Sequence, residues 1–289
     1  MKEKTDKIVT SPPSTLSNLW LFFVVVFCWT WFFWIAAAAL GVSAQSALGI
    51  VLEVLGLLGP MLGGIGFTYF TQSKESWREY WSRIIDPKRV RPKWYLIVFL
   101  FVPGLFAVAV LLDVASSGSA ALVLIRERVA PFLSAPSTIV PFVLGVFIYG
   151  PFPEELGWRG YALDQLQARW NALVSSLILG AVWTLWHVPL FFIKDTLFYS
   201  HGAWSPWFWQ FMMEVIPFAV IFTWIFNNTR RSTLAAILFH FMANFTPDLT
   251  NVTAGTNFYS ALLWIIAATA VVALWGAGTL TGREYAPSG

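Results

Sequence analysis

Long runs of apolar residues, separated by polar, glycine-rich or proline-rich stretches, divide the chain into segments of membrane-spanning length. A helix needs about 20 mostly apolar residues to cross a bilayer. Eight segments approach or exceed that length: residues 18–41, 47–70, 94–114, 137–156, 172–193, 206–226, 232–247 and 258–279. The pattern therefore predicts an all-α, polytopic membrane helix bundle with about eight transmembrane helices.

Composition strengthens this prediction. Of the 289 residues, 57% are hydrophobic and 11% are charged, whereas a soluble domain carries about 25% charged residues. The chain has too few charges to cover itself with polar surface in water, and no soluble domain is visible between the apolar segments. The single cysteine, Cys28, excludes a disulfide framework and a cysteine-based zinc site.

The first apolar run could be mistaken for a secretory signal. It extends from Leu19 to about Leu40, which is too long for the 7–15 apolar residues of a signal peptide. We expect it to be an uncleaved first membrane helix.

Lys and Arg are distributed unequally between the two sides of the predicted bundle. If the N-terminus is cytoplasmic, the connection 71–93, which is rich in Lys and Arg, lies inside. Only Arg126, Arg128 and Lys194, of 18 basic residues, then fall outside. Because cytoplasmic loops carry an excess of basic residues, we expect both termini to be cytoplasmic. Topology also explains the formal charge of +3, and nothing indicates a nucleic-acid partner.

The basic connection 71–93 also contains many aromatic residues, among them Trp77, Tyr80 and Trp81. Basic residues mixed with aromatic ones are typical of a segment that lies in the lipid headgroup layer. The segment is either an interfacial connector or a gate for a substrate tethered to the membrane.

Several polar residues fall where lipid or helix packing would favour apolar ones. Ionisable groups inside membrane helices are costly, so each is a candidate functional residue. Three groups stand out. They are Glu154, Glu155 and Arg159 in PFPEELGWRGYAL, His187 in AVWTLWHVP, and His240 with Asn244 in LFHFMANF.

Helical spacing pairs these residues. Residues four apart share one face of a helix, so Glu155 can pair with Arg159 and His240 projects with Asn244. The same spacing relates Trp183 to His187. Glu154 points about 100° away from Glu155, so one carboxylate can hold Arg159 while the other faces a cavity.

A hairpin would bring the first two groups to one depth. If the helix of Glu154 continues to about Arg169 and the chain turns near residues 170–171, Glu154 and His187 both lie roughly 24 Å from the turn. Pro151, Pro153 and Gly157 allow a kink or widened backbone beside the carboxylates, which is tolerated in a membrane where the backbone lines a watery cavity.

Hydrolysis is the chemistry that fits these side chains. A partly desolvated carboxylate can act as a general base, and two imidazoles with an amide can orient water and stabilise an oxyanion. Alternatively, Glu154, His187 and His240 could bind zinc and acidify its water. The H-E-x-x-H zinc motif is absent, as are a Ser or Cys nucleophile motif and a phosphate-binding loop.

At these residues the chain resembles the CPBP family of intramembrane endopeptidases, which includes type II CAAX prenyl proteases and bacteriocin-processing or immunity-related proteins. The family motifs are E-E-x-x-x-R, F-x-x-x-H and H-x-x-x-N. The first is complete at 154–159 and the third at 240–244, whereas Trp183 replaces the phenylalanine of the second. The resemblance covers roughly residues 137–250.

The resemblance implies a role for each motif residue. Glu154 would activate the attacking water, and Glu155 and Arg159 would form a pair that supports Glu154. The remaining motif residues would stabilise the oxyanion and orient the water; they are His187, His240 and Asn244. Trp158 and Trp183 would form cavity walls. The implied reaction requires no cofactor, although a divalent metal such as zinc is an alternative.

We therefore expect three regions: N-terminal transmembrane helices (1–136), a catalytic core (137–250), and a C-terminal helix with its tail (251–289). The expected partners are a peptide or protein substrate at the membrane and the lipid bilayer itself. The alternatives are a non-catalytic immunity or scaffold protein and a zinc-dependent protease; a transporter is disfavoured because the chain shows no inverted repeats. Glu53 and Glu214 also fall within apolar segments and have no assigned role.

Overall fold

A computed structural model of the protein describes residues 16–118, 120–250 and 253–282. These residues are helical, apart from turns and one isolated backbone bridge between Ser43 and Lys194. The helices of the first half are α1 (Leu16–Leu40), α2 (Ala47–Leu57), α3 (Gly59–Thr71), α4 (Lys74–Ile85), η1 (Pro87–Arg89), α5 (Pro92–Ser117), α6 (Ala120–Ser134), η2 (Pro136–Thr138) and α7 (Ile139–Ile148). Those of the second half are α8 (Pro151–Gly157), η3 (Trp158–Ala162), α9 (Leu163–Gln167), α10 (Ala172–Trp186), η4 (Val188–Phe192), α11 (Leu197–His201), α12 (Pro206–Asn228), α13 (Thr233–Thr250) and α14 (Ala254–Trp275).

The membrane prediction is confirmed. Seven helical stretches among the described residues are long and apolar enough to span a bilayer. The eighth expected segment, 232–247, corresponds to α13, an 18-residue helix that contains His240, Asn244 and Asp248. The outer surface of the bundle exposes large apolar side chains such as Phe32, Leu100 and Leu274, as lipid contact requires. The protein is an integral, multi-pass membrane protein.

Among the described residues, three α-helices lie outside the eight apolar segments and the expected continuation of the fourth, namely α4, α6 and α11. The longest of them, α6, lies between two predicted spans. This segment contains Arg126, Glu127 and Arg128, together with Pro131, so it lacks the apolar character by which the membrane spans were identified. Both chain ends, which were predicted to be cytoplasmic, belong to residues 1–15 and 283–289 and lie outside the described residues.

Two of the predicted spans are interrupted. The segment 47–70 divides at Leu58 into α2 and α3, just before Pro60. The fourth span bends at Gly150, whose φ of 142° is open to glycine but strained for other residues. Beyond Gly150 the chain forms α8, then the π-helical turn η3, then α9. The kink and the widened backbone thus both occur next to the carboxylates, at Gly150 and in η3.

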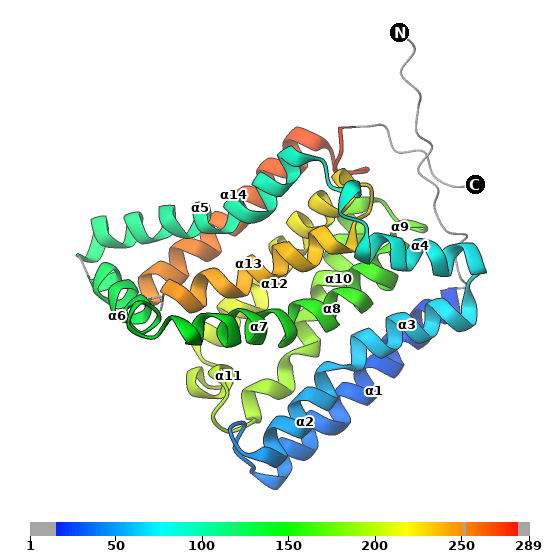
Figure 1. Ribbon diagram of the computed structural model, residues 1–289. Coiled ribbons are helices and arrows are strands. Elements are labelled where there is room, and N and C mark those ends of the chain that lie inside the picture. Colours follow the sequence, from blue (N-terminus) through cyan, green and yellow to red (C-terminus); the bar gives the residue numbers. More distant parts are fainter. Residues whose placement is uncertain (1–15, 119, 251–252, 283–289) are drawn as a thin grey trace.

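The polar motifs are brought together by the packing of α8, α10, α12 and α13. The chain turns at residues 168–171, so α9 and α10 form the expected hairpin, and the Asn171 side chain caps α10 by accepting a hydrogen bond from the Val174 amide. α13 lies inside the bundle and packs against α5, α8 and α12 (Figure 1). The helix of His240 is therefore adjacent to the helix of the two glutamates.

Glycines allow a close approach of α3 to α8. A Cβ atom on Gly64 would lie 2.3 Å from the carbonyl oxygen of Leu156, and one on Gly157 would lie 2.4 Å from that of Pro60. Neither position can hold a larger residue unless the helices separate. The N-terminal half is thus pressed directly against the segment that carries Glu154 and Glu155.

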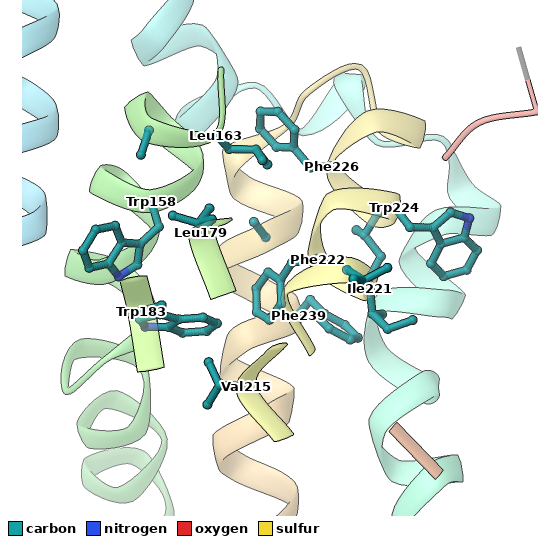
Figure 2. Packing of buried hydrophobic residues seen from close by; sticks show 14 of the residues in the cluster. Trp158, Leu163, Leu179, Trp183, Val215, Ile221, Phe222, Trp224, Phe226 and Phe239 are labelled. Carbon is teal, nitrogen blue, oxygen red and sulfur yellow. The ribbon is translucent and has the colours of Figure 1, made fainter. Parts of the chain in front are cut away.

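An aromatic core surrounds the polar motifs. Trp158, Trp183, Phe222 and Phe239 are all buried and belong to one cluster that also includes residues of α1, α5 and α14 (Figure 2). The polar site is consequently enclosed by apolar packing on the side of α12, and its geometry is fixed by that packing.

Candidate active site

The two glutamates lie in the first turns of α8, directly after the bend at Gly150. Pro151 occupies the first helical position, where its fixed φ favours helix initiation and its missing N–H costs nothing. A carboxylate is favoured near a helix N-terminus, where the backbone dipole is positive. The sequence around Pro151 thus starts a short helix and places Glu154 in its first turn.

Glu155 joins two of the three motifs. Its Oε1 accepts a hydrogen bond from Nη1 of Arg159 over 2.9 Å, and Nδ1 of His240 lies 2.9 Å from the same oxygen. Both Glu155 and Arg159 are fully buried. The pair between Glu155 and Arg159 is the i, i+4 interaction expected from their spacing, and the contact with His240 connects α8 to α13.

Arg159 is held by aromatic rings as well as by the carboxylate. Its guanidinium carbon lies 3.9 Å from the ring centre of Phe222 and 4.6 Å from that of Trp183. Such cation–π contacts stabilise a desolvated guanidinium. Phe222 on α12, which the sequence did not single out, therefore takes part in fixing Arg159.

Glu154 is turned away from Arg159 and bonds to the facing arm of the hairpin. Its Oε2 accepts a hydrogen bond from the indole Nε1 of Trp183 over 2.6 Å. The hydrogen bond to Glu154 from the facing helix thus comes from Trp183. The described residues show no direct hydrogen bond between Glu154 and His187, the residue expected at its depth, which lies one helical turn beyond Trp183.

His187 stands one turn beyond Trp183, at the end of α10. Its Nδ1 lies 2.7 Å from the carbonyl oxygen of Trp183, so Nδ1 carries the proton that is donated. The ring is packed among the aromatic rings of Trp186, Phe198 and Phe211. His187 and Glu154 are therefore both hydrogen-bonded to Trp183. The Nδ1 atom of His187 is used in this contact, so Nε2 is the ring atom that could bind a water molecule or a substrate.

Asn244 approaches Glu154 across the bend at Gly150. A Cβ atom placed on Gly150 would lie 3.2 Å from Nδ2 of Asn244 and 3.4 Å from Oε1 of Glu154. The amide and the free oxygen of the carboxylate thus border the same small space. A side chain at this position would therefore crowd both groups.

The remaining predicted residues take other positions. Trp158, expected as a cavity wall, packs against Phe22 and Phe23 of α1 and against Trp186, within the hydrophobic core. Glu53 is buried in α2, and its Oε1 has no hydrogen-bond partner among the described residues. Glu214 interacts with Gln210, one turn earlier on α12. None of these three contacts the cluster of Glu154 and Glu155 through a hydrogen bond that the described residues show.

The alternative zinc ligands do not form a metal cluster in this arrangement. Among the described residues, no three His, Cys, Asp or Glu side chains gather closely enough to hold a metal ion. His240 and His187 each direct Nδ1 to a protein oxygen, and Glu154 is bonded to Trp183. These side chains are arranged as hydrogen-bonding groups.

The hydrogen bond between Trp183 and Glu154 is the main feature that the sequence interpretation missed. The signal was present, because Trp183 replaces the phenylalanine of the family motif and an indole has an N–H that phenyl lacks. The substitution was interpreted only as a change of cavity wall.

Two comparisons with known proteins bear on this site. Residues 136–246 match the model of the Rce1-like family, described as type II CAAX prenyl endopeptidase Rce1-like. Over 254 residues the chain is 28% identical to CAAX prenyl protease 2 of Methanococcus maripaludis. This match covers 87% of this chain and 92% of that protein. The matched family region contains all six polar motif residues.

These matches confirm the resemblance indicated by the three motifs. They extend it into the first three helices, which had been identified by hydropathy alone. The protein is an intramembrane endopeptidase, and the substrate of such an enzyme is a protein associated with the membrane.

Proposed function

We propose that this Rce1-like intramembrane endopeptidase removes the C-terminal residues of prenylated CAAX-type proteins, with Glu154 activating the attacking water. The observation that carries the proposal is the position of Glu154. One carboxylate oxygen is held by Trp183 and the other borders the open space next to Asn244. The similarity to CAAX prenyl protease 2 of Methanococcus maripaludis supports this substrate class.

In the proposed reaction, Oε1 of Glu154 takes a proton from a water molecule in the space at Gly150. The resulting hydroxide attacks the carbonyl carbon of the scissile peptide. Glu154 then gives its proton to the leaving amine, so the carboxylate is regenerated. The step needs no covalent enzyme intermediate.

The developing oxyanion requires hydrogen-bond donors. Nδ2 of Asn244 is a permanent donor, and it borders the same space as the attacking water. Each imidazole directs Nδ1 to a protein oxygen, so each offers Nε2 to the substrate. In the neutral ring Nε2 accepts a hydrogen bond from water, and in the protonated ring it donates to the oxyanion.

Glu155 and Arg159 would hold the catalytic groups in position without contacting the substrate. The carboxylate of Glu155 fixes the ring of His240, and Arg159 balances the buried charge of Glu155. We propose that no resident metal is needed, because the hydrogen-bonding groups supply a base and an oxyanion site.

The test is cleavage of a farnesylated CAAX peptide by the purified full-length protein in lipid vesicles. Glu154→Gln should lower kcat by at least about 10²-fold, as the loss of a general base does. Glu214→Gln is the matched control, because it makes the same change at another membrane-embedded glutamate. Turnover of Glu154→Gln at the rate of this control would refute the role of Glu154.

Two further experiments test the preference for a prenylated substrate and the need for a metal ion. The same peptide without its prenyl group should be a poorer substrate, and equal cleavage of both would contradict the prenyl preference. Treatment with a chelator should leave the rate unchanged. A rate lost to the chelator and restored specifically by zinc would overturn the metal-free mechanism.

A further inference from the structure

The amphipathic helix α4 reaches into the catalytic hairpin through two buried side chains. The hydroxyl of Tyr80 donates a hydrogen bond to the carbonyl oxygen of Leu156 over 3.0 Å, and Nη2 of Arg83 donates to that of Gly160 over 2.9 Å. Tyr80 is completely buried and Arg83 is 4% exposed. α4 therefore bonds to the backbone of the hairpin just after the two glutamates and again within η3.

The segment between these two carbonyl groups is the least regular part of the hairpin. The amide of Leu163 bonds to the carbonyl of Trp158, five residues earlier, which is the spacing of a π-helix. Such turns are rare and often occur at functional sites. This π-helical turn carries Arg159, so its backbone geometry sets where the guanidinium lies.

An ion-pair network holds Asp164, which lies shortly after this π-helical turn. Asp164, on α9, pairs with both Arg83 of α4 and Arg231, which lies just before α13. Asp164 is 6% exposed, and removing one partner of a buried ion pair is strongly unfavourable. A single carboxylate thus joins α4, the hairpin and the entry to the helix of His240.

The fit of α4 against the hairpin is tight. A Cβ atom on Gly160 would lie 2.9 Å from Cε2 of Tyr80, so a larger residue there would displace the Tyr80 ring. The opposite face of α4 exposes Lys74, Glu75 and Arg78. Figure 1 shows α4 lying across one end of the bundle beside α9.

We propose that Tyr80 and Arg83 are positioning residues for the peptidase site. They hold η3 so that Arg159 meets Glu155, and Glu155 in turn fixes His240. The inference rests on the proposed function. Its physical basis is that catalytic groups must be held within roughly 0.5 Å of their productive geometry by the groups behind them. A π-helical turn held from one side by α4 provides such support.

The decisive variant is Tyr80→Phe, which removes one hydroxyl and keeps the ring. Tyr95→Phe is a matched control, because the Tyr95 hydroxyl also donates to a backbone carbonyl, that of Pro87, but away from the hairpin. In the vesicle assay, Tyr80→Phe should lower kcat by about 3- to 10-fold with little change in KM, the factor expected for one net hydrogen bond. A kcat equal to that of Tyr95→Phe, or a change confined to KM, would overturn the proposal.

A second measurement does not depend on catalysis. Amide hydrogen exchange of peptides covering residues 156–163 should become faster in Tyr80→Phe and stay unchanged in Tyr95→Phe. Unchanged exchange in Tyr80→Phe would also overturn the proposal. If the wild-type protein cleaves no prenylated peptide, the proposed function fails, and the exchange result alone then decides whether α4 holds the hairpin.

Arg83→Lys separates charge from geometry. Lysine keeps a positive charge for Asp164 but lacks the guanidinium fork that bonds Asp164 and the carbonyl of Gly160 together. We expect it to lower kcat and speed exchange in residues 156–163 as Tyr80→Phe does. Wild-type kcat and exchange in Arg83→Lys would show that only the charge of Arg83 matters, which contradicts its positioning role.

Discussion

Trp183 donates a hydrogen bond from its indole nitrogen to Oε2 of Glu154 over 2.6 Å, while its ring lies 4.6 Å from the guanidinium carbon of Arg159. One side chain thus contacts both the proposed base and the arginine of the same motif. The contact crosses the hairpin from α10 to α8. The contact occupies Oε2 of the carboxylate, and Oε1 lies with the Asn244 amide around Gly150.

Trp183→Phe tests this contact. The substitution keeps an aromatic ring for Arg159 but removes the donor to Glu154, so the carboxylate loses one constraint on its orientation. We expect kcat to fall by roughly 10- to 100-fold, since hydrogen bonds to charged groups contribute about 1.5–3 kcal/mol. Trp224→Phe is the control, because Trp224 is buried and its Nε1 has no hydrogen-bond partner among the described residues. Equal kcat in the two variants would contradict the assignment.

Substitutions of Glu155 and of Arg159 should have non-additive effects on the free energy of unfolding, because the two residues form a buried ion pair. Arg159→Leu leaves a fully buried carboxylate without its counter-charge, which costs about 3–5 kcal/mol of unfolding free energy. The double variant Glu155→Gln with Arg159→Leu removes both charges and should recover much of that loss. Thermal unfolding in detergent, compared across the double-mutant cycle, measures the coupling. Additive effects of the two single variants would show that the pair contributes no interaction energy.

Gly150→Ala should impair turnover through both backbone and space. The φ of 142° is strained for alanine, at a cost of roughly 1–3 kcal/mol, and the new methyl group would enter the space bordered by Asn244 and Glu154. We expect a fall in kcat/KM of at least about 10-fold, the factor that corresponds to roughly 1.4 kcal/mol. Gly145→Ala is the control, because a Cβ there meets no atom within 4 Å among the described residues. Wild-type kcat/KM in Gly150→Ala would show that this space is not used.

The orientation of the protein can be tested by labelling. Cys28 is the only cysteine, so Cys28→Ser provides a cysteine-free background. Lys88 and Lys194 are both exposed. Lys88 lies in η1, just after α4, whereas Lys194 forms a backbone bridge with Ser43 in the loop before α2. The start of α2 and the helix α4 lie at opposite ends of the α2–α3 pair (Figure 1). In intact cells, an impermeant maleimide should label Lys194→Cys, and Lys88→Cys only after permeabilisation. The reverse pattern would overturn the cytoplasmic placement of 71–93.

Hydropathy predicted the membrane helices well because crossing a bilayer imposes length and apolarity on each helix separately. It gave no indication of α6, a helix that is not among the candidate membrane spans and in which Arg126 and Arg128 interrupt the apolar pattern. Helix formation there does not depend on a membrane-length apolar run. The division of the second span at Leu58 was also missed, although Pro60 marked the place.

For the site, the sequence determined the contacts that lie within one helix. The spacing of Glu155 and Arg159 predicts their ion pair, because residues four apart share a helical face. The contacts between helices were not determined in this way. The approach of His240 to Glu155 depends on the packing of α13 against α8, and that of Trp183 to Glu154 depends on the register of the hairpin.

By itself, the sequence determined that this protein lies in the membrane, which polar residues are candidates for its chemistry, and that Glu155 and Arg159 pair locally, because length, apolarity and helical period are properties of single segments. Only the tertiary structure decided which side chain faces which across the helices, including the donor to Glu154 and the support from α4. Those relations depend on how the helices cross and on the irregular turn at 158–162, neither of which is a property of a single segment.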